Sequence, residues 1–229
     1  MVVSFTNNFI FLRVPKNAST TVSAHFIQNG CNPRFDTWTR IHEINAKDVN
    51  VPSSVFENHN HDWHYVHLSL NEIIKCGVVT EEQAREMDVI NIIREPFERQ
   101  LSLFFFRYKE SNPTVGSKTL DEEVIKKFFR KCFKDGYHYT DGSNKLRQYD
   151  YGTIGDEHVA ECWLYENIDE HMREFCSRKK IPFFPLDTFK SSERKEYDMS
   201  YYDDATYEAV ANYYAKDIEL YNKLKEGTK

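Results

Sequence analysis

The sequence has no glycine between Met1 and Gln28, the stretch that contains the segment around which the chain is organised. That segment begins with the apolar residues 9–12 and continues through Lys16 into a run of small residues. A Walker A phosphate loop follows the pattern G-x-x-x-x-G-K-[ST], in which glycines let the backbone wrap closely around a phosphate. The missing glycines therefore exclude a Walker A loop in this part of the chain.

Long apolar runs are also missing. No segment approaches the roughly 20 consecutive apolar residues that cross a bilayer as a helix, and residues 1–5 lack the basic start and apolar region of a signal peptide. We therefore expect a soluble, cytoplasmic protein without a membrane span. The cysteines agree with a reducing compartment, because an odd, scattered set without a C-x-x-C pattern disfavours a disulfide framework or a metal site. They are Cys31, Cys76, Cys132, Cys162 and Cys176.

An excess of positive charge is absent too, since the formal net charge is −6. Nucleic-acid-binding domains are usually basic, so we expect no nucleic-acid partner. The same charge argues against a densely anionic polymer as a ligand unless a local basic groove exists. A hydrophobic content of 40% over 229 residues is enough for one sizeable folded domain. Because no repeat or linker divides the chain, we predict a single domain over residues 1–229.

Apolar segments alternate with segments of helical spacing. Residues 9–12, 88–93 and 162–165 have the composition of buried parallel strands, and residues 65–68 are a shorter candidate. Helices are expected between them, with a last helix running from about Asp203 through Leu224. This alternation predicts an α/β fold, with a central, mainly parallel sheet flanked by helices.

Side chains that cap helices mark several helix starts. Ser19, Thr20 or Thr21 can cap the helix that follows the first strand. Capping boxes are expected where Ser69 is followed by Glu72, and where Thr80 is followed by Gln83. The remaining helix starts are expected at Pro96, between Thr119 and Glu122, and near Ile168.

The segment after the first strand has the features of an anion-binding loop. Residues 14–21 read V-P-K-N-A-S-T-T, and Pro15 ends the strand because it lacks a backbone donor. The loop amides and the dipole of the following helix point at one spot, to which Lys16 adds a full charge. An ordinary strand-to-helix connection with a surface lysine is the alternative.

A second polar segment follows the strand at residues 88–93. Residues 94–102 read R-E-P-F-E-R-Q-L-S. Arg94 is expected at the carboxyl end of the strand, where a guanidinium can bind two phosphate oxygens, and Ser102 is expected two turns into the next helix. The alternatives are an ion pair of Arg94 with a neighbouring glutamate and an ordinary helix serine.

The two segments, in this order, resemble the 5′-phosphosulfate loop and the 3′-phosphate motif of sulfotransferases. The first is most similar to the loop of carbohydrate O-sulfotransferases of the heparan-sulfate 2-O type, V-P-K-[TN]-[AG]-[ST]-[TS]. The resemblance implies a P-loop-like sulfotransferase fold, 3′-phosphoadenylyl sulfate (PAPS) as donor, adenosine 3′,5′-bisphosphate (PAP) as product, a carbohydrate or other small hydroxyl acceptor, and no metal. By resemblance, the donor-binding residues are Lys16, Asn17, Ala18, Ser19, Thr20, Thr21, Arg94 and Ser102.

A histidine-rich segment lies between the two motifs. Transfer to a hydroxyl needs a base, and histidine suits that role near neutral pH. The related enzymes carry a catalytic histidine in an H-x-H-[VL]-S segment, which aligns His67 with the second histidine and Tyr65 with the first. His67 is therefore the expected base and His64 the second candidate, with Lys16 assisting catalysis. A histidine satisfied by structural hydrogen bonds and a loose metal cluster are the alternatives.

Two other functions are consistent with the sequence. One is a nucleotide-dependent kinase with an atypical phosphate loop, which would need a magnesium-binding carboxylate after a strand, whereas Asp88 precedes its strand. The other is a non-catalytic module that binds PAP or PAPS, which Tyr65 in place of a histidine favours. Residues 144–149 are weakly similar to an N-x-x-x-R-x-L stretch of the family. The sequence leaves the acceptor and the oligomeric state open.

Overall fold

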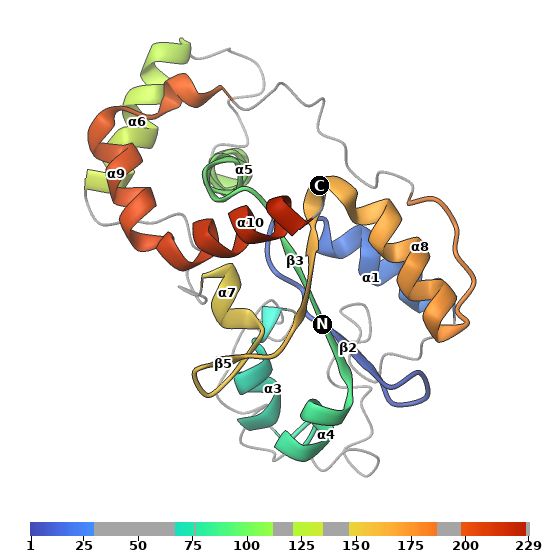
Figure 1. Cartoon of the computed structure of the whole chain (residues 1–229). Coiled ribbons are helices and arrows are strands. Elements are labelled where there is room, and N and C mark those ends of the chain that lie inside the picture. Colours follow the sequence, from blue (N-terminus) through green and yellow to red (C-terminus); the bar gives the residue numbers. More distant parts are fainter. Residues whose placement is uncertain (30–66, 76, 112–120, 135–146, 187–197, 228–229) are drawn as a thin grey trace.

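A four-stranded sheet forms the centre of the computed structural model, which describes residues 1–29, 67–75, 77–111, 121–134, 147–186 and 198–227 (Figure 1). The strand order is β1-β2-β3-β6, in which β1 is antiparallel to β2 and the other pairs are parallel. The predicted α/β class with a mainly parallel central sheet is therefore confirmed. The strands are β1 Val2–Ser4, β2 Phe9–Phe11, β3 Asp88–Ile93 and β6 Glu161–Leu164.

Helices follow each parallel strand. They are α1 Ser19–Gln28, α3 Leu70–Lys75, α4 Glu81–Glu86, α5 Pro96–Ser111, α6 Glu122–Lys134, α7 Gln148–Tyr151, α8 Ile168–Lys179, α9 Asp204–Tyr213 and α10 Ala215–Gly227. Two short 3-10 helices, η4 Tyr165–Asn167 and η5 Met199–Tyr201, and a small hairpin of β4 Thr153–Ile154 with β5 Glu157–His158 complete the described elements. None of the helices in this part of the chain is long and apolar enough to cross a membrane.

The two faces of the sheet bury different residues, because successive side chains of a strand point to opposite faces. Phe9, Phe11 and Ile90 pack with α1 and α8, which lie side by side on one face (Figure 1). Ile10 and Val89 pack on the other face with residues of α3 and α4. Since both faces are covered, the parallel strands are apolar along most of their length.

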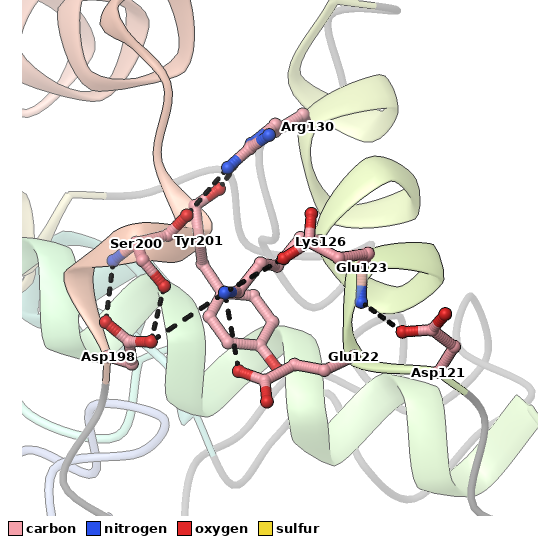
Figure 2. Close-up of polar contacts among 8 residues, drawn as sticks. All are labelled: Asp121, Glu122, Glu123, Lys126, Arg130, Asp198, Ser200 and Tyr201. Atoms are coloured by element: carbon pink, nitrogen blue, oxygen red, sulfur yellow. Dashed lines mark hydrogen bonds and ion pairs between the residues drawn. The ribbon is translucent and has the colours of Figure 1, made fainter.

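α6 and η5 form a layer with α5 and α9 around an aromatic core. Polar contacts also link α6 to the segment of η5 (Figure 2). The guanidinium of Arg130 donates to the backbone carbonyls of Ser200 at 2.6 Å and Tyr201 at 2.9 Å. Lys126 lies 3.3 Å from Glu123 and 3.9 Å from Asp198. The carboxylates of Glu123 and Asp198 are exposed, so water screens these ion pairs. The aromatic core of this layer therefore contributes more to its stability than they do.

Two predicted capping boxes are present and one predicted cap is wrong. Ser69 and Glu72 bond reciprocally at the start of α3, and Thr80 and Gln83 do so at the start of α4. At the start of α1 the N-cap is Ala18, in a left-handed conformation and without a side-chain cap, instead of one of the three hydroxyl residues. The tight loop before α1 places its hydroxyls inside the first turn.

Two other elements differ from the sequence predictions. The last helix is two helices, because the chain changes direction at the buried Tyr214, between α9 and α10. The described part of the predicted strand 65–68 is not a strand, since His67 has a 3-10 conformation and Leu68 has no regular structure. The backbone turns there to enter the capping box of α3. Residues 65 and 66 lie outside the described part.

Candidate anion-binding site

The loop between β2 and α1 lies at the carboxyl end of the parallel strands, which is where ligands bind in open α/β sheets. Lys16 and Ala18 both have left-handed backbones, with φ angles of 66° and 54°. These conformations bring the loop into the helix start at Ser19 over a few residues. The first turn of α1 contains no acidic side chain, so the backbone amides of this turn and the helix dipole favour an anion.

Asn17 holds the loop to the end of β3. Its side chain is fully buried, and Nδ2 donates to the carbonyl of Ile92 and to Oε1 of Gln148, both at 2.6 Å. A buried amide that makes such bonds is costly to move, because its polar atoms would lose their partners. The sequence predicted Asn17 as a donor-binding residue through the loop; its side chain, however, faces the interior and positions the backbone.

Two arginines of the second motif contact the same loop. Arg94 Nη1 donates to the carbonyl of Lys16 at 3.1 Å, and Arg99 Nε donates to that of Pro15 at 3.2 Å. Both guanidinium groups are buried. The structure therefore brings together the two motifs that the sequence separates by more than 70 residues. Arg99, the second arginine of this motif, thus bonds to a backbone carbonyl of the loop.

Arg94 is also held by side chains at the ends of neighbouring elements. Its guanidinium lies 4.6 Å from the ring centroid of Tyr165, which directly follows β6. Glu98, one turn into α5, lies 3.5 Å away. The ion pair suggested as an alternative is thus present, but its glutamate is partly exposed, whereas the arginine is buried between the loop and a ring.

Lys16 of the loop contacts the helix that contains Ser102. The ammonium of Lys16 lies 4.4 Å from the ring centroid of Phe106. Phe106 follows Ser102 by one helical turn on α5, so the two lie on one helix face. Ser102 is buried. In α1, Oγ1 of Thr20 accepts a hydrogen bond of 3.1 Å from Arg13. The structure therefore brings Arg94 to the loop of residues 16–21, and it relates Ser102 to that loop only through its place on α5, one turn before Phe106.

His67 lies against the same loop, although it is not on a strand. Its Nδ1 is 2.6 Å from the backbone carbonyl of Arg13. A carbonyl can only accept, so Nδ1 carries the proton and Nε2 carries the lone pair. Burial lowers the pKa of His67 to about 4, because a charged ring would lose its hydration. At neutral pH the ring is therefore neutral and has the tautomer that a base needs at Nε2.

Gln148 and Asp217 belong to the site, but sequence reasoning did not select them. Gln148 starts α7 and is fully buried among Asn17, Asn91 and Arg94. Asp217 of α10 is fully buried, and its carboxylate accepts hydrogen bonds of 2.9 Å from the backbone N–H groups of Gln148 and Tyr149. Burial raises the pKa of this carboxyl. For Gln148 the available signal was the weak family similarity of residues 144–149.

No group of three or more metal-ligating side chains comes together within the described ranges. The histidines at positions 59, 61 and 64, which the cluster alternative needs, lie outside those ranges.

Comparison with known proteins gives one finding. Residues 1–223 match the model of the family described as the Sulfotransferase family. The match covers nearly the whole chain and includes both anion-binding segments. No curated protein and no solved structure gives a significant match.

Proposed function

Because this chain belongs to the sulfotransferase family, whose enzymes transfer sulfuryl groups, we propose that it uses PAPS as donor and releases PAP. The fold is the α/β sulfotransferase fold with its mainly parallel sheet. The observation that carries the proposal is the contact of Arg94 with the carbonyl of Lys16. It unites an anion-binding loop with a buried guanidinium, and PAPS has anionic groups at both its 5′ and its 3′ positions.

The loop is suited to the 5′-phosphosulfate. The amides of residues 17–21 and the dipole of α1 would hold its oxygens. Lys16 would stabilise the negative charge that grows on the bridging oxygen as the sulfur–oxygen bond breaks. A lysine and backbone amides can neutralise the leaving phosphate without a metal ion. The left-handed conformations of Lys16 and Ala18 support this role, because they prearrange the loop before a ligand arrives.

Arg94 and Ser102 would bind the 3′-phosphate. Arg94 supplies a charge-assisted donor, and Ser102 supplies a hydroxyl from the following helix. The burial of both side chains supports the assignment, because low solvent exposure strengthens a charge-assisted bond.

His67 would serve as the base in an in-line transfer. The acceptor oxygen attacks the sulfur from the side opposite the bridging oxygen, the bridging bond breaks, and the acceptor proton moves to Nε2 of His67. The neutral ring with its proton on Nδ1 supports this role. His64 is the second candidate for the base.

The acceptor is proposed to be a hydroxyl of a carbohydrate or another small molecule. The similarity of residues 14–21 to the loop of heparan-sulfate 2-O-type enzymes supports a carbohydrate. The net charge of −6 favours a small or weakly charged saccharide over a densely anionic polymer. We treat residues 1–229 as one catalytic domain.

A turnover assay with sulfur-labelled PAPS and a panel of neutral and anionic saccharides tests the proposal. Calorimetry with PAP and AMP accompanies it, and tighter binding of PAP is expected. Tight PAP binding without transfer to any acceptor would favour the non-catalytic module. Equal affinity for PAP and AMP would overturn the donor assignment, and magnesium-dependent transfer from ATP would favour a kinase.

A further inference from the structure

The side chain of Gln148 joins the two anion-binding segments of the proposed donor site. Its Oε1 accepts the backbone amide of Arg94 at 2.9 Å and Nδ2 of Asn17 at 2.6 Å. Its Nε2 donates to the carbonyl of Arg94 at 2.9 Å. One side-chain amide therefore bonds to both the N–H and the carbonyl of Arg94, in the segment of residues 94–102. The same amide also bonds to Asn17, in the loop of residues 14–21.

The orientation of this amide is fixed by its partners. The backbone N–H of Arg94 can only donate and its carbonyl can only accept, so Oε1 and Nε2 cannot exchange places. Nδ2 of Asn17 is fixed in the same way by the carbonyl of Ile92. Because both side chains are fully buried, water cannot replace a lost partner easily.

The backbone of Gln148 is itself anchored from two directions. Its N–H donates to Asp217 of α10 at 2.9 Å, and its carbonyl accepts from Nδ2 of Asn91 in β3 at 2.8 Å. α7 has only four residues and cannot hold this position alone. Anchoring between β3 and α10 fixes the point from which the side chain reaches both segments.

We propose that Gln148 is a positioning residue that sets the spacing between the 5′-phosphosulfate loop and the 3′-phosphate arginine. This inference rests on the proposed function, since it assigns those two ligands to the two segments. In this role Gln148 acts through the backbone of Arg94 and the side chain of Asn17, with which its amide bonds. Its effect is therefore greatest on a ligand that engages both segments at once.

The test compares ligands that bind one segment or both. Gln148→Met keeps the length of the side chain but removes its hydrogen bonds. The preference of the wild type for PAP over AMP should fall at least about fivefold in this variant, the factor expected for losing one or more hydrogen bonds. The affinity for AMP should stay within about twofold, because AMP does not bridge the segments. Thr206→Val is the matched control, since Thr206 is also fully buried and loses hydrogen bonds in this variant, but its hydroxyl bonds to Asp203 at the start of α9, outside both segments.

A second variant keeps the test decisive if Gln148→Met does not fold. In Gln148→Glu the ionised carboxylate still accepts from Arg94 N and Asn17 but repels the carbonyl of Arg94. Once protonated, the introduced carboxyl can donate to that carbonyl as the amide does. The preference for PAP, relative to that of the wild type at the same pH, should therefore recover as the pH is lowered.

The outcomes separate this inference from the function on which it rests. A wild type without a preference for PAP would overturn the proposed function and this inference with it. A wild-type preference that survives Gln148→Met, or a Gln148→Glu variant whose preference equals that of the wild type at every pH, would overturn the positioning role alone. A fall in Thr206→Val equal to that in Gln148→Met would also overturn it, because the effect would then be a general loss of buried hydrogen bonds.

Discussion

The guanidinium of Arg94 donates a hydrogen bond to the carbonyl of Lys16, the residue whose own backbone has a left-handed conformation. Such a conformation costs about 1–2 kcal/mol for a residue other than glycine, so surrounding contacts must enforce it. The bonds from Arg99 to Pro15 and from Asn17 to Ile92 act on either side of it. The loop is thus shaped by residues of the second motif before any ligand binds.

The first prediction concerns Lys16. Lys16→Ala should lower the rate of sulfuryl transfer by about 10²–10³, because a charge directed at the leaving group typically contributes this much. Lys179→Ala is the matched control. Lys179 is a partly buried lysine that pairs with Asp88 at the amino end of β3, whereas the loop of Lys16 lies at the carboxyl ends of the strands. Steady-state kinetics should give a near-normal rate for the control. A Lys16→Ala variant as fast as the wild type would remove this lysine from the mechanism.

The second prediction concerns Arg94. Arg94→Ala should erase most of the preference for PAP over AMP, a loss of about 10- to 150-fold for one charge-assisted hydrogen bond. Ser102→Ala should cause a smaller loss, because a neutral hydroxyl contributes less. Calorimetry with both nucleotides measures the ratio, and Arg178→Ala, on the exposed face of α8, is the control. If Arg94→Ala keeps the wild-type ratio, the 3′-phosphate binds elsewhere.

Local sequence signals predicted the elements that depend on local chemistry. The apolar run at residues 88–93 forms β3 with the predicted bounds, and the two capping boxes start α3 and α4. Each of these depends on residues within a few positions of one another, so a sequence pattern is enough to find it. The two motif segments were found by their resemblance to the family and by their positions after strands.

Features that depend on distant contacts were missed. The chain changes direction at Tyr214 because α9 packs on α6, whereas α10 packs on β6. This change of direction brings Asp217 of α10 within hydrogen-bond distance of α7. Gln148 matters because of Asn17 and Arg94, which are 131 and 54 positions away. Glutamine in a polar stretch carries no local mark of such a role, so only the folded chain identifies it.

The third prediction concerns the strained backbone at Ala18. Ala18→Gly should raise stability by about 0.5–1 kcal/mol, because glycine adopts a φ of 54° without strain but costs entropy in the unfolded chain. Lys180→Gly, at a φ of 55° beyond α8, should give a similar gain outside the site. The midpoint temperature of thermal unfolding should rise by about 2–4 °C per kcal/mol in each variant. A gain at Lys180 with a loss at Ala18 would mean that the methyl group of Ala18 makes needed contacts.

The last prediction concerns His67. His67→Asn places an amide N–H₂ group near the position of Nδ1, so the bond to the carbonyl of Arg13 can persist, but it provides no base. Transfer should fall by about 10²–10⁴, while the affinity for PAP stays within a few-fold of the wild type. His158→Ala is the control, because burial also lowers the pKa of His158, which lies in the hairpin of β4 and β5.

The pH dependence of the wild-type rate gives an independent check. Since the pKa of His67 is lowered to about 4, the ring stays neutral from pH 8 to pH 6, and its protonation should slow transfer only as the pH falls toward 4. Protonation also destabilises the fold, because the unfolded chain binds this proton near pH 6.5 and the folded chain only near pH 4. The free energy of unfolding should therefore decrease as the pH is lowered from 6.5 to 4. The His67→Asn variant should lose this part of the acid sensitivity. An active His67→Asn variant together with an inactive His64→Asn variant would move the base to His64, and full activity in both would place the base outside this segment.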